Sequence, residues 1–193
     1  MTFTKHDYDQ VWELLRHPDR KVRLAIPVLL EWIKSLDPAK EPPDTDYPFF
    51  LHAGQRRSYN ANQNFRNPAW RKEDPDGALM IHPDDVAELG AADGGWMTVE
   101  TRRGSIVVRI QADDSMRRGM VALPHGYGQY YPGTDGRVLV GPRINFLTAS
   151  DDCDPIAATP YHRNVRVRLR PADSISAQAA EANSMAVRAM ASA

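Results

Sequence analysis

Residues 81–128 read IHPDDVAELGAADGGWMTVETRRGSIVVRIQADDSMRRGMVALPHGYG, and this stretch decides the fold. It opens on a predicted short helix, 82–90, with proline and two acidic residues in its first turn and glycine after its end. The β-rich segments 97–101 and 105–110 flank a turn that ends in glycine, which predicts a hairpin. A further strand is expected at 120–123. The stretch therefore predicts short strands around one small helix.

Strand patterns continue on both sides of this stretch. Phe49-Phe50-Leu51 is a strand candidate that runs into Gly54, and residues 165–169 alternate apolar and basic side chains. That alternation is typical of a strand with one buried face. Several short strands with turn signals between them favour a mainly β fold, a β-barrel that carries short helices.

Both ends of the chain have a different character. Residues 5–36 predict a helical extension, interrupted at Pro18, whose second helix has Pro27 in its first turns or at its start. The segment 37–46 is rich in proline and charge and predicts a linker. Residues 172–193 are rich in alanine and serine, which is compatible with a loosely packed helix or a disordered tail.

Length, charge and cysteine content limit the possible functions. A chain of 193 residues suits one domain with a helical extension, and a net charge of -1 gives no electrostatic footprint for wrapping nucleic acid. Cys153 is the only cysteine, which excludes an internal disulfide, a cysteine-based zinc site and a four-cysteine iron–sulfur cluster. The first twelve residues have no signal-peptide pattern, and no apolar run approaches the ~18 residues of a membrane span. We expect a soluble, cytoplasmic protein without nucleic-acid or membrane partners.

The stretch 53–67, AGQRRSYNANQNFRN, is the strongest candidate for ligand binding. Its amides and guanidinium groups are costly to bury without partners. A planar heterocycle attached to phosphates would satisfy both kinds of group, because amides match a ring edge and arginines fork onto phosphate. The alternative is a solvated loop whose asparagines cap turns.

Two further stretches allow a functional and a structural interpretation. His125 and Gly126 lie in 123–128, LPHGYG, where glycines would let backbone approach a ligand, although a turn leaving a strand is the favoured interpretation from these residues alone. The pair Gly104-Ser105 invites comparison with self-processing barrels, which cleave a Gly-Ser bond. A hairpin in which Gly104 supplies a positive φ is the favoured interpretation.

Taken together, these elements resemble one family. The stretch 81–128, followed by NFLT (145–148), DPIAATP (154–160) and NVRVRL (164–169), is similar to the molybdopterin dinucleotide-binding domain. That domain ends the large subunits of formate dehydrogenases, nitrate reductases and thiosulfate reductases. The resemblance covers roughly residues 48–171 and implies a six-stranded double-psi β-barrel, as in aspartate decarboxylase. It also implies a role in holding molybdopterin guanine dinucleotide, in an enzyme of the formate dehydrogenase-like kind.

The resemblance also implies a set of cofactor-binding residues. The loop after the first strand lines the cofactor in such enzymes, the asparagine of the NFLT element reaches the pterin, and a basic residue after the Thr-Pro element does likewise. Gln55 stands where an arginine is frequent, and Tyr59 stands where a histidine is frequent. With the glycine-rich turn included, the expected cofactor-binding residues are Gly54, Gln55, Arg56, Arg57, Tyr59, Asn60, Asn62, His125, Gly126, Asn145 and Arg163.

The family's catalytic parts are expected outside this chain. Its metal ligand comes from an earlier domain, and its iron–sulfur cluster binds an amino-terminal cysteine set. Cys153 lies in the acidic run 151–154, and we do not assign it to a metal. We therefore expect residues 1–47 to lead from a preceding domain, with the remaining domains of a parent oxidoreductase as partners, and no catalysis by this chain alone. The alternative is a free-standing barrel that serves as an interaction module without cofactor.

Overall fold

Two units make up the chain, Met1–Pro42 and Pro43–Ala193. The computed structural model describes residues 8–37, 43–55, 74–133 and 136–192. For Gln55 and residues 190–192 it describes the backbone only. The division between the units falls inside the proline-rich segment 37–46.

The first unit contains two short helices, a 3-10 helix η1 (Tyr8–Leu14) and the α-helix α1 (Pro27–Ser35). The second predicted helix begins at Pro27, one of the two placements that the sequence left open for this proline, because its missing N–H is tolerated in a first turn. The apolar residues Val22, Leu24 and Ile26 precede it and are exposed. None of the described residues of this unit is buried.

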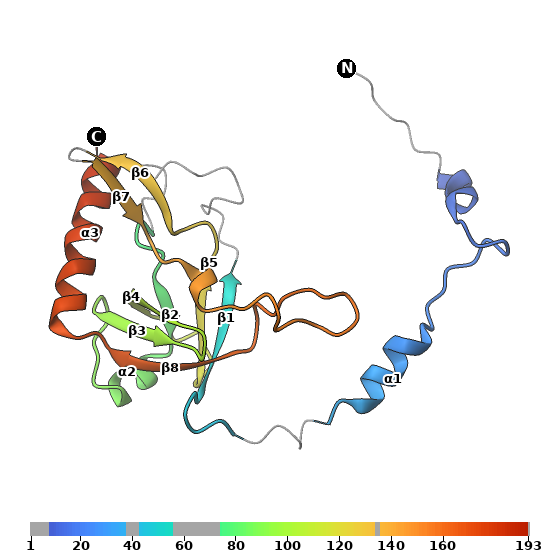
Figure 1. Ribbon diagram of the computed structural model, residues 1–193, viewed down its shortest axis with the longest axis horizontal. Helices are drawn as coiled ribbons and strands as arrows, with labels where there is room; N and C mark the ends of the chain where they lie inside the picture. The colour runs from blue at the N-terminus through green and yellow to red at the C-terminus, as the bar shows by residue number, and fades with distance from the viewer. Residues whose placement is uncertain (1–7, 38–42, 56–73, 134–135, 193) are drawn as a thin grey trace. The chain divides into compact units, whose positions relative to one another are not determined.

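Six strands of the second unit close into a mixed barrel in the order β1-β5-β2-β4-β3-β8 (Figure 1). This confirms the mainly β, six-stranded barrel expected from the sequence. The strands are β1 (Phe49–Gln55), β2 (Leu79–Ile81), β3 (Trp96–Glu100), β4 (Ser105–Ala112), β5 (Met120–Pro124) and β8 (Val165–Pro171). The predicted short helix is α2 (Pro83–Glu88), with His82 as its N-cap. Strands β6 (Gln129–Gly133) and β7 (Gly136–Val140) form a separate hairpin.

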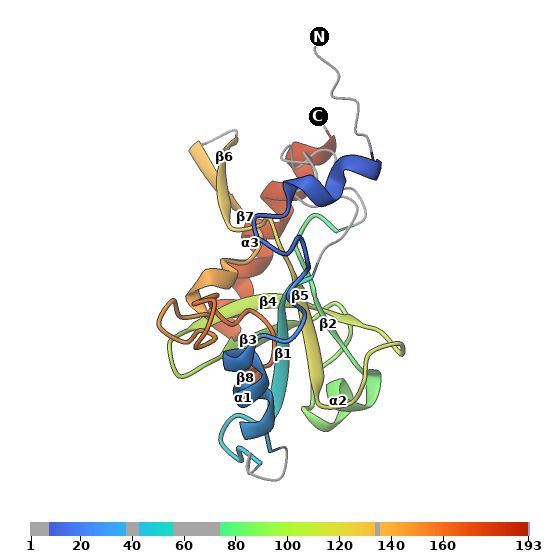
Figure 2. The ribbon, with the colours of Figure 1, turned by 90° about the vertical axis from the view of Figure 1, so that its right-hand side faces the viewer.

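Alternating side chains fill the barrel. Along β8, Val167 and Leu169 are buried, whereas Arg168 between them and Arg170 after them are exposed. Strand β1 pairs with β5 on one side and with β8 on the other, so the barrel closes through β1 (Figure 2). The core consists of apolar side chains from all six strands, together with α2 and a 3-10 helix near residue 145, namely Leu51, Ala53, Leu79, Ile81, Val86, Met97, Val99, Val108, Ile110, Val121, Leu123, Ile144, Leu147, Val167 and Leu169.

The carboxy-terminal segment is a packed helix, α3 (Ser174–Ser192), which lies against β4 and β7. Of the two alternatives that the sequence left open, a loosely packed helix and a disordered tail, the structure has a helix, and its Ser184 and Val187 are each 1% exposed. Ion pairs connect the helix to the barrel. The carboxylate of Asp76, just before β2, lies 2.6 Å from Arg188 of α3 and 3.2 Å from Nε of Arg109 on β4.

Glu181 of α3 extends this network to the strands. Its carboxylate lies 2.8 Å from Arg109 and accepts a hydrogen bond of 2.9 Å from the indole of Trp96 on β3. The Arg109 guanidinium also lies over the Trp96 ring, 5.0 Å from its centre. Helix α3 is therefore attached to the barrel by charges as well as by apolar packing.

Candidate functional site

Strand directions gather several loops at one end of the barrel. Strands β1 and β5 run parallel, and Gln55 pairs beside Pro124 where both strands end. Strands β2 and β8 run antiparallel to these two, and β4 runs parallel to β2, so that β2, β4 and β8 begin at the same end. We call this the exit end of the barrel. Loops that leave β1 and β5 and loops that enter β8 therefore meet there.

Gly54 and His125 are in direct contact at the exit end. A Cβ atom at Gly54 would lie 2.2 Å from Nε2 of His125, and the φ of Gly54 is +86°. Only glycine fits this position, for both steric and conformational reasons. Gly126 has a φ of +82°, which turns the chain sharply after the His125 side chain.

The 3-10 helix η5 (Ile144–Phe146) lies beside the β3–β4 turn, which stands at the exit end. Ile144 and the following Leu147 are buried in the barrel, whereas Asn145 and Phe146 between them are exposed. The guanidinium of Arg103, in the β3–β4 turn, donates a hydrogen bond to the carbonyl of Thr148. The helix therefore closes the barrel and presents Asn145 outward.

The β3–β4 turn corrects one expectation. The predicted hairpin is present, but Gly104 does not have a positive φ. Glycine is required there by packing, because a Cβ at Gly104 would lie 3.0 Å from the carbonyl oxygen of Phe146 in η5. The Gly104-Ser105 pair therefore fits a close approach of two loops.

Arg163 stands immediately before β8, after a loop with internal hydrogen bonds. Asp154 accepts bonds from the backbone N–H groups of Ile156 (2.9 Å) and Ala157 (2.8 Å). The backbones of Cys153 and Pro160 form an isolated antiparallel β-bridge. Asn164 has a φ of +60°, a conformation that asparagine tolerates better than most residues, and it leads from Arg163 into the strand.

The Asp154 turn predicts a response to acid. The N–H groups of Ala157 and Ile156 hold the pKa of Asp154 below its usual value of 3.8. The carboxylate therefore stabilises the turn above about pH 4, and this contribution is lost as the pH falls through the lowered pKa. We expect the amides of Ile156 and Ala157 to lose protection in that range, measured by hydrogen exchange relative to intrinsic rates. Asp154→Ala should lack this step, and Asp151→Ala should retain it.

A groove lies on the outer face of β1 and β5 and reaches the exit end. Its volume is about 400 Å³, and it contains both Gly54 and Arg163. His52 points into it from β1, since its neighbours Leu51 and Ala53 are buried in the barrel. The loop before β5 contributes the opposite end of the groove with Ser115, Met116 and Arg117.

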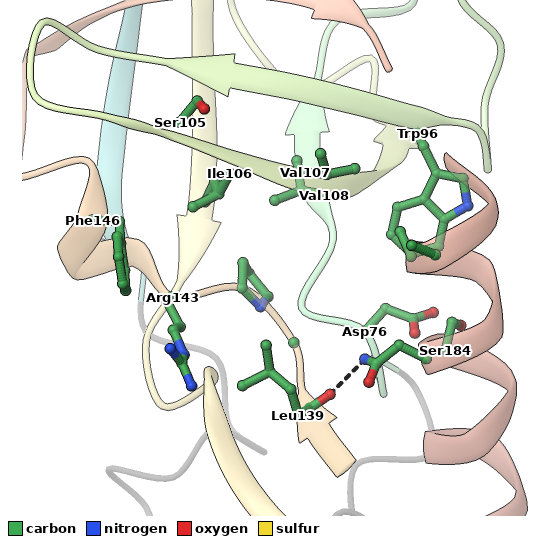
Figure 3. A pocket seen from close by; sticks show the side chains of 15 residues that line it. Asp76, Trp96, Ser105, Ile106, Val107, Val108, Leu139, Arg143, Phe146 and Ser184 are labelled. Atoms are coloured by element: carbon green, nitrogen blue, oxygen red, sulfur yellow. Dashed lines mark hydrogen bonds between the residues drawn. The ribbon is translucent and has the colours of Figure 1, made fainter. Parts of the chain in front are cut away.

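A second cavity, of about 430 Å³, lies between α3 and the barrel (Figure 3). Arg143 and Phe146 line one part of it, and Asp76 and Ser184 line another (Figure 3). The amide of Asn183 donates a hydrogen bond to the carbonyl of Leu139 across it. Most of the other lining residues are aliphatic or small.

The structure places part of the expected site. Gly54, the backbone of Gln55, His125, Gly126, Asn145 and Arg163 all lie at the exit end. Arg56, Arg57, Tyr59, Asn60 and Asn62 lie outside the described residues. Sequence reasoning missed His52 and Arg117 as groove residues. The alternation of side chains along β1 could have indicated that His52 faces away from the core. No sequence pattern indicated that Arg117 lines the groove.

Two kinds of feature are absent from the described residues. No group of three or more histidine, cysteine, aspartate or glutamate side chains that could hold a metal ion occurs within residues 8–37, 43–55, 74–133 and 136–192. None of the helices in these ranges has the length and apolar character that crossing a membrane requires.

Comparisons with known proteins agree with this geometry. The family model described as "Molydopterin dinucleotide binding domain" matches residues 49–166. Acetylene hydratase of Syntrophotalea acetylenica is 30% identical over 105 residues, which are 54% of this chain and 14% of that enzyme. Periplasmic nitrate reductase of Desulfovibrio desulfuricans is 28% identical over 160 residues, 81% of this chain and 20% of that enzyme.

A solved structure supports the same assignment. The structure of acetylene hydratase from Pelobacter acetylenicus superposes with a TM-score of 0.53 and 25% sequence identity, covering 65% of this chain and 18% of that one. The chain thus spans a fifth or less of the length of each of these relatives. The family match covers the whole barrel up to the first residues of β8. The chain belongs to the molybdopterin dinucleotide-binding domain family.

Proposed function

We propose that this chain binds molybdopterin guanine dinucleotide as the carboxy-terminal domain of a larger molybdenum or tungsten oxidoreductase, of a formate dehydrogenase-like kind. The observation that carries the proposal is that Gly54 contacts His125 and shares a groove with Arg163 at the exit end, where η5 also presents Asn145 beside the β3–β4 turn. These residues come from four separate parts of the sequence.

The residues present fit such a cofactor. Gly54 has no Cβ, and the Gly126 turn exposes backbone, so a flat ligand can approach the main chain closely at both positions. The amide of Asn145 can pair with the edge of a heterocycle, and the guanidinium of Arg163 can fork onto an oxyanion. His125 lies against Gly54, where it can donate to or accept from the same ligand. When bound, the cofactor supplies the metal centre, and the residues of this chain hold and orient it.

The first unit supports the proposed partner, the remaining domains of the parent enzyme. None of its described residues is buried, and the exposed side chains include large apolar ones: Trp12, Leu24 and Ile33 are 58%, 89% and 58% exposed. Apolar side chains exposed at this density are typical of a surface that another domain covers. We further propose a reducing, cytoplasmic location, which accords with a single thiol.

Cofactor content of the parent enzyme tests the proposal. We expect the purified enzyme to contain molybdenum or tungsten and to release guanosine monophosphate on acid hydrolysis. Arg163→Ala and Asn145→Ala should each lower both contents several-fold, because each removes a donor to the cofactor. Arg170→Ala is the matched control: it removes the same charge near the far end of β8, away from the exit end, where the carboxylate of Glu100 is 3.9 Å away.

The test also separates the proposal from the alternative of an interaction module without cofactor. An enzyme that contains neither metal nor guanine nucleotide would contradict the proposal. Unchanged metal content in both exit-end variants would likewise remove these residues from the site. A decrease equal to that of Arg170→Ala would indicate a general loss of stability.

A further inference from the structure

We propose that Tyr127 is a positioning residue of the cofactor site, and that it fixes both the His125 imidazole and the segment that carries Asn145. The inference rests on the proposed function and adds a residue that lines neither the groove nor the α3 cavity. Tyr127 is 9% exposed, so its side chain is shielded from a ligand and acts through its neighbours.

The turn after β5 places Tyr127 and His125 against different parts of the chain. Gly126 and Gly128, on either side of Tyr127, have φ angles of +82° and +79°, so the chain changes direction before and after it. His125 lies against Gly54 of β1, whereas the Tyr127 ring is held elsewhere. Only Gly126 separates the two side chains, so a displacement of Tyr127 is passed on to His125.

The ring of Tyr127 occupies a slot between Gly77 and Gly141, which are far apart in sequence. A Cβ atom at Gly77 would lie 2.8 Å from Cγ of Tyr127, and a Cβ atom at Gly141 would lie 2.8 Å from its Cβ atom. The ring therefore fits only because neither neighbour has a side chain. The hydroxyl of Tyr127 donates a hydrogen bond to the carbonyl of Asp74, which satisfies its polar end.

The same turn is attached to the segment that leads into η5. The N–H of Gly128 donates a hydrogen bond of 2.7 Å to the carbonyl of Val140, at the end of β7. The next residue is Gly141, against which the Tyr127 ring lies, and Asn145 follows within η5. Loss of the ring would free this segment, and with it the amide of Asn145.

Fixed positions of these groups favour binding, because a site that is already ordered loses less entropy when it takes its ligand. A looser site can keep every one of its contacts and still bind more weakly. We therefore expect substitutions of Tyr127 to reduce cofactor retention beyond what their effect on stability explains. A residue with a purely structural role would affect retention only through stability.

The metal and guanosine monophosphate content of the parent enzyme, together with urea unfolding of the full chain, tests the inference. Tyr127→Leu and Tyr127→Met remove the ring and should each lower both contents several-fold. Tyr127→Phe keeps the ring in the slot and should retain about half or more of the wild-type content, although it leaves the Asp74 carbonyl without its donor. Val86→Ala is the control, since it removes buried atoms from α2, which follows β2 at the opposite end of the barrel.

Nitrogen NMR spectra of the His125 imidazole in the cofactor-free chain give a second readout, which does not depend on loading. We expect one set of His125 signals in the wild type, Tyr127→Phe and Val86→Ala. Broadened or doubled signals are expected in Tyr127→Leu and Tyr127→Met, because the turn is no longer held.

The outcomes separate this inference from the proposed function. A wild-type parent that carries cofactor, with ring-free variants that load as well as Val86→Ala of equal stability, overturns the role of Tyr127 alone. Failure of both ring-free variants to fold also overturns it, since the ring then serves folding only. A wild-type parent without cofactor overturns the inference and the proposed function together.

Discussion

Replacement of Gly54 by alanine is expected to destabilise the barrel by about 2 kcal/mol or more and to empty the exit end of cofactor. A non-glycine residue at a φ of +86° carries a conformational cost of about 1–2 kcal/mol. The new Cβ would also lie 2.2 Å from Nε2 and 2.4 Å from Cε1 of His125, so the imidazole would have to move. Because the ring is the end of a rotatable side chain, displacement of His125 is the expected response.

Urea unfolding, with cofactor content of the parent enzyme as a second readout, separates the two costs. Gly90→Ala is the matched control, since Gly90 has a φ of +68° and open space where its Cβ would stand. It should show the conformational cost alone. The double variant Gly54→Ala/His125→Ala should recover the steric part of the destabilisation. Equal stability of Gly54→Ala and the wild type would contradict the contact between these two residues.

Replacement of Asp76 by alanine is expected to cost about 2–4 kcal/mol and to loosen α3. Asp76 is 8% exposed and neutralises Arg109 and Arg188 together. Removal of one member of a buried ion pair leaves the other charge uncompensated, although the half-exposed Arg188 recovers part of its hydration. Glu181 still holds Arg109 at 2.8 Å, which limits the loss.

Urea unfolding and hydrogen exchange in α3 measure this effect. The amides of the last turns of α3 should lose protection before those of the barrel strands, because Arg188 lies in that part of the helix. Glu88→Ala is the control, since Glu88 is an exposed partner of Arg118 and surface pairs contribute about 0–1 kcal/mol. Unchanged protection of α3 in Asp76→Ala would show that apolar packing alone holds the helix.

The barrel could be predicted where local patterns were strong. The alternation in 165–169 and the turn between 97–101 and 105–110 specify strands from their own residues. Strand β2 has three residues, too few for a period to show, and the β6–β7 hairpin contains two glycines and a proline. The packing of α3 was not predictable, because it depends on Asp76, Arg109 and Arg188, which are far apart in sequence.

The candidate site was predictable only in part, for a similar reason. The resemblance selected Gly54, Asn145 and Arg163 one at a time, and the parallel pairing of β1 and β5 explains why Gly54 lies beside His125. Arg117 lines the groove from the opposite end of the barrel, and no local sequence motif predicts that position. Gly104 was correctly placed in a turn, but its need for glycine came from η5, forty residues later in sequence.

Closure of the barrel by β1 and β8 has a consequence for biosynthesis. Phe49 pairs with Val167, so the first strand of the barrel finds one of its two neighbours only when nearly the whole domain has left the ribosome. Contacts between such distant residues form slowly. Until then, β1 and β3 each keep an open edge, and both edges can recruit a foreign strand. A nascent chain that stalls before Val165 should therefore aggregate, and it should depend on chaperones more than the finished protein does.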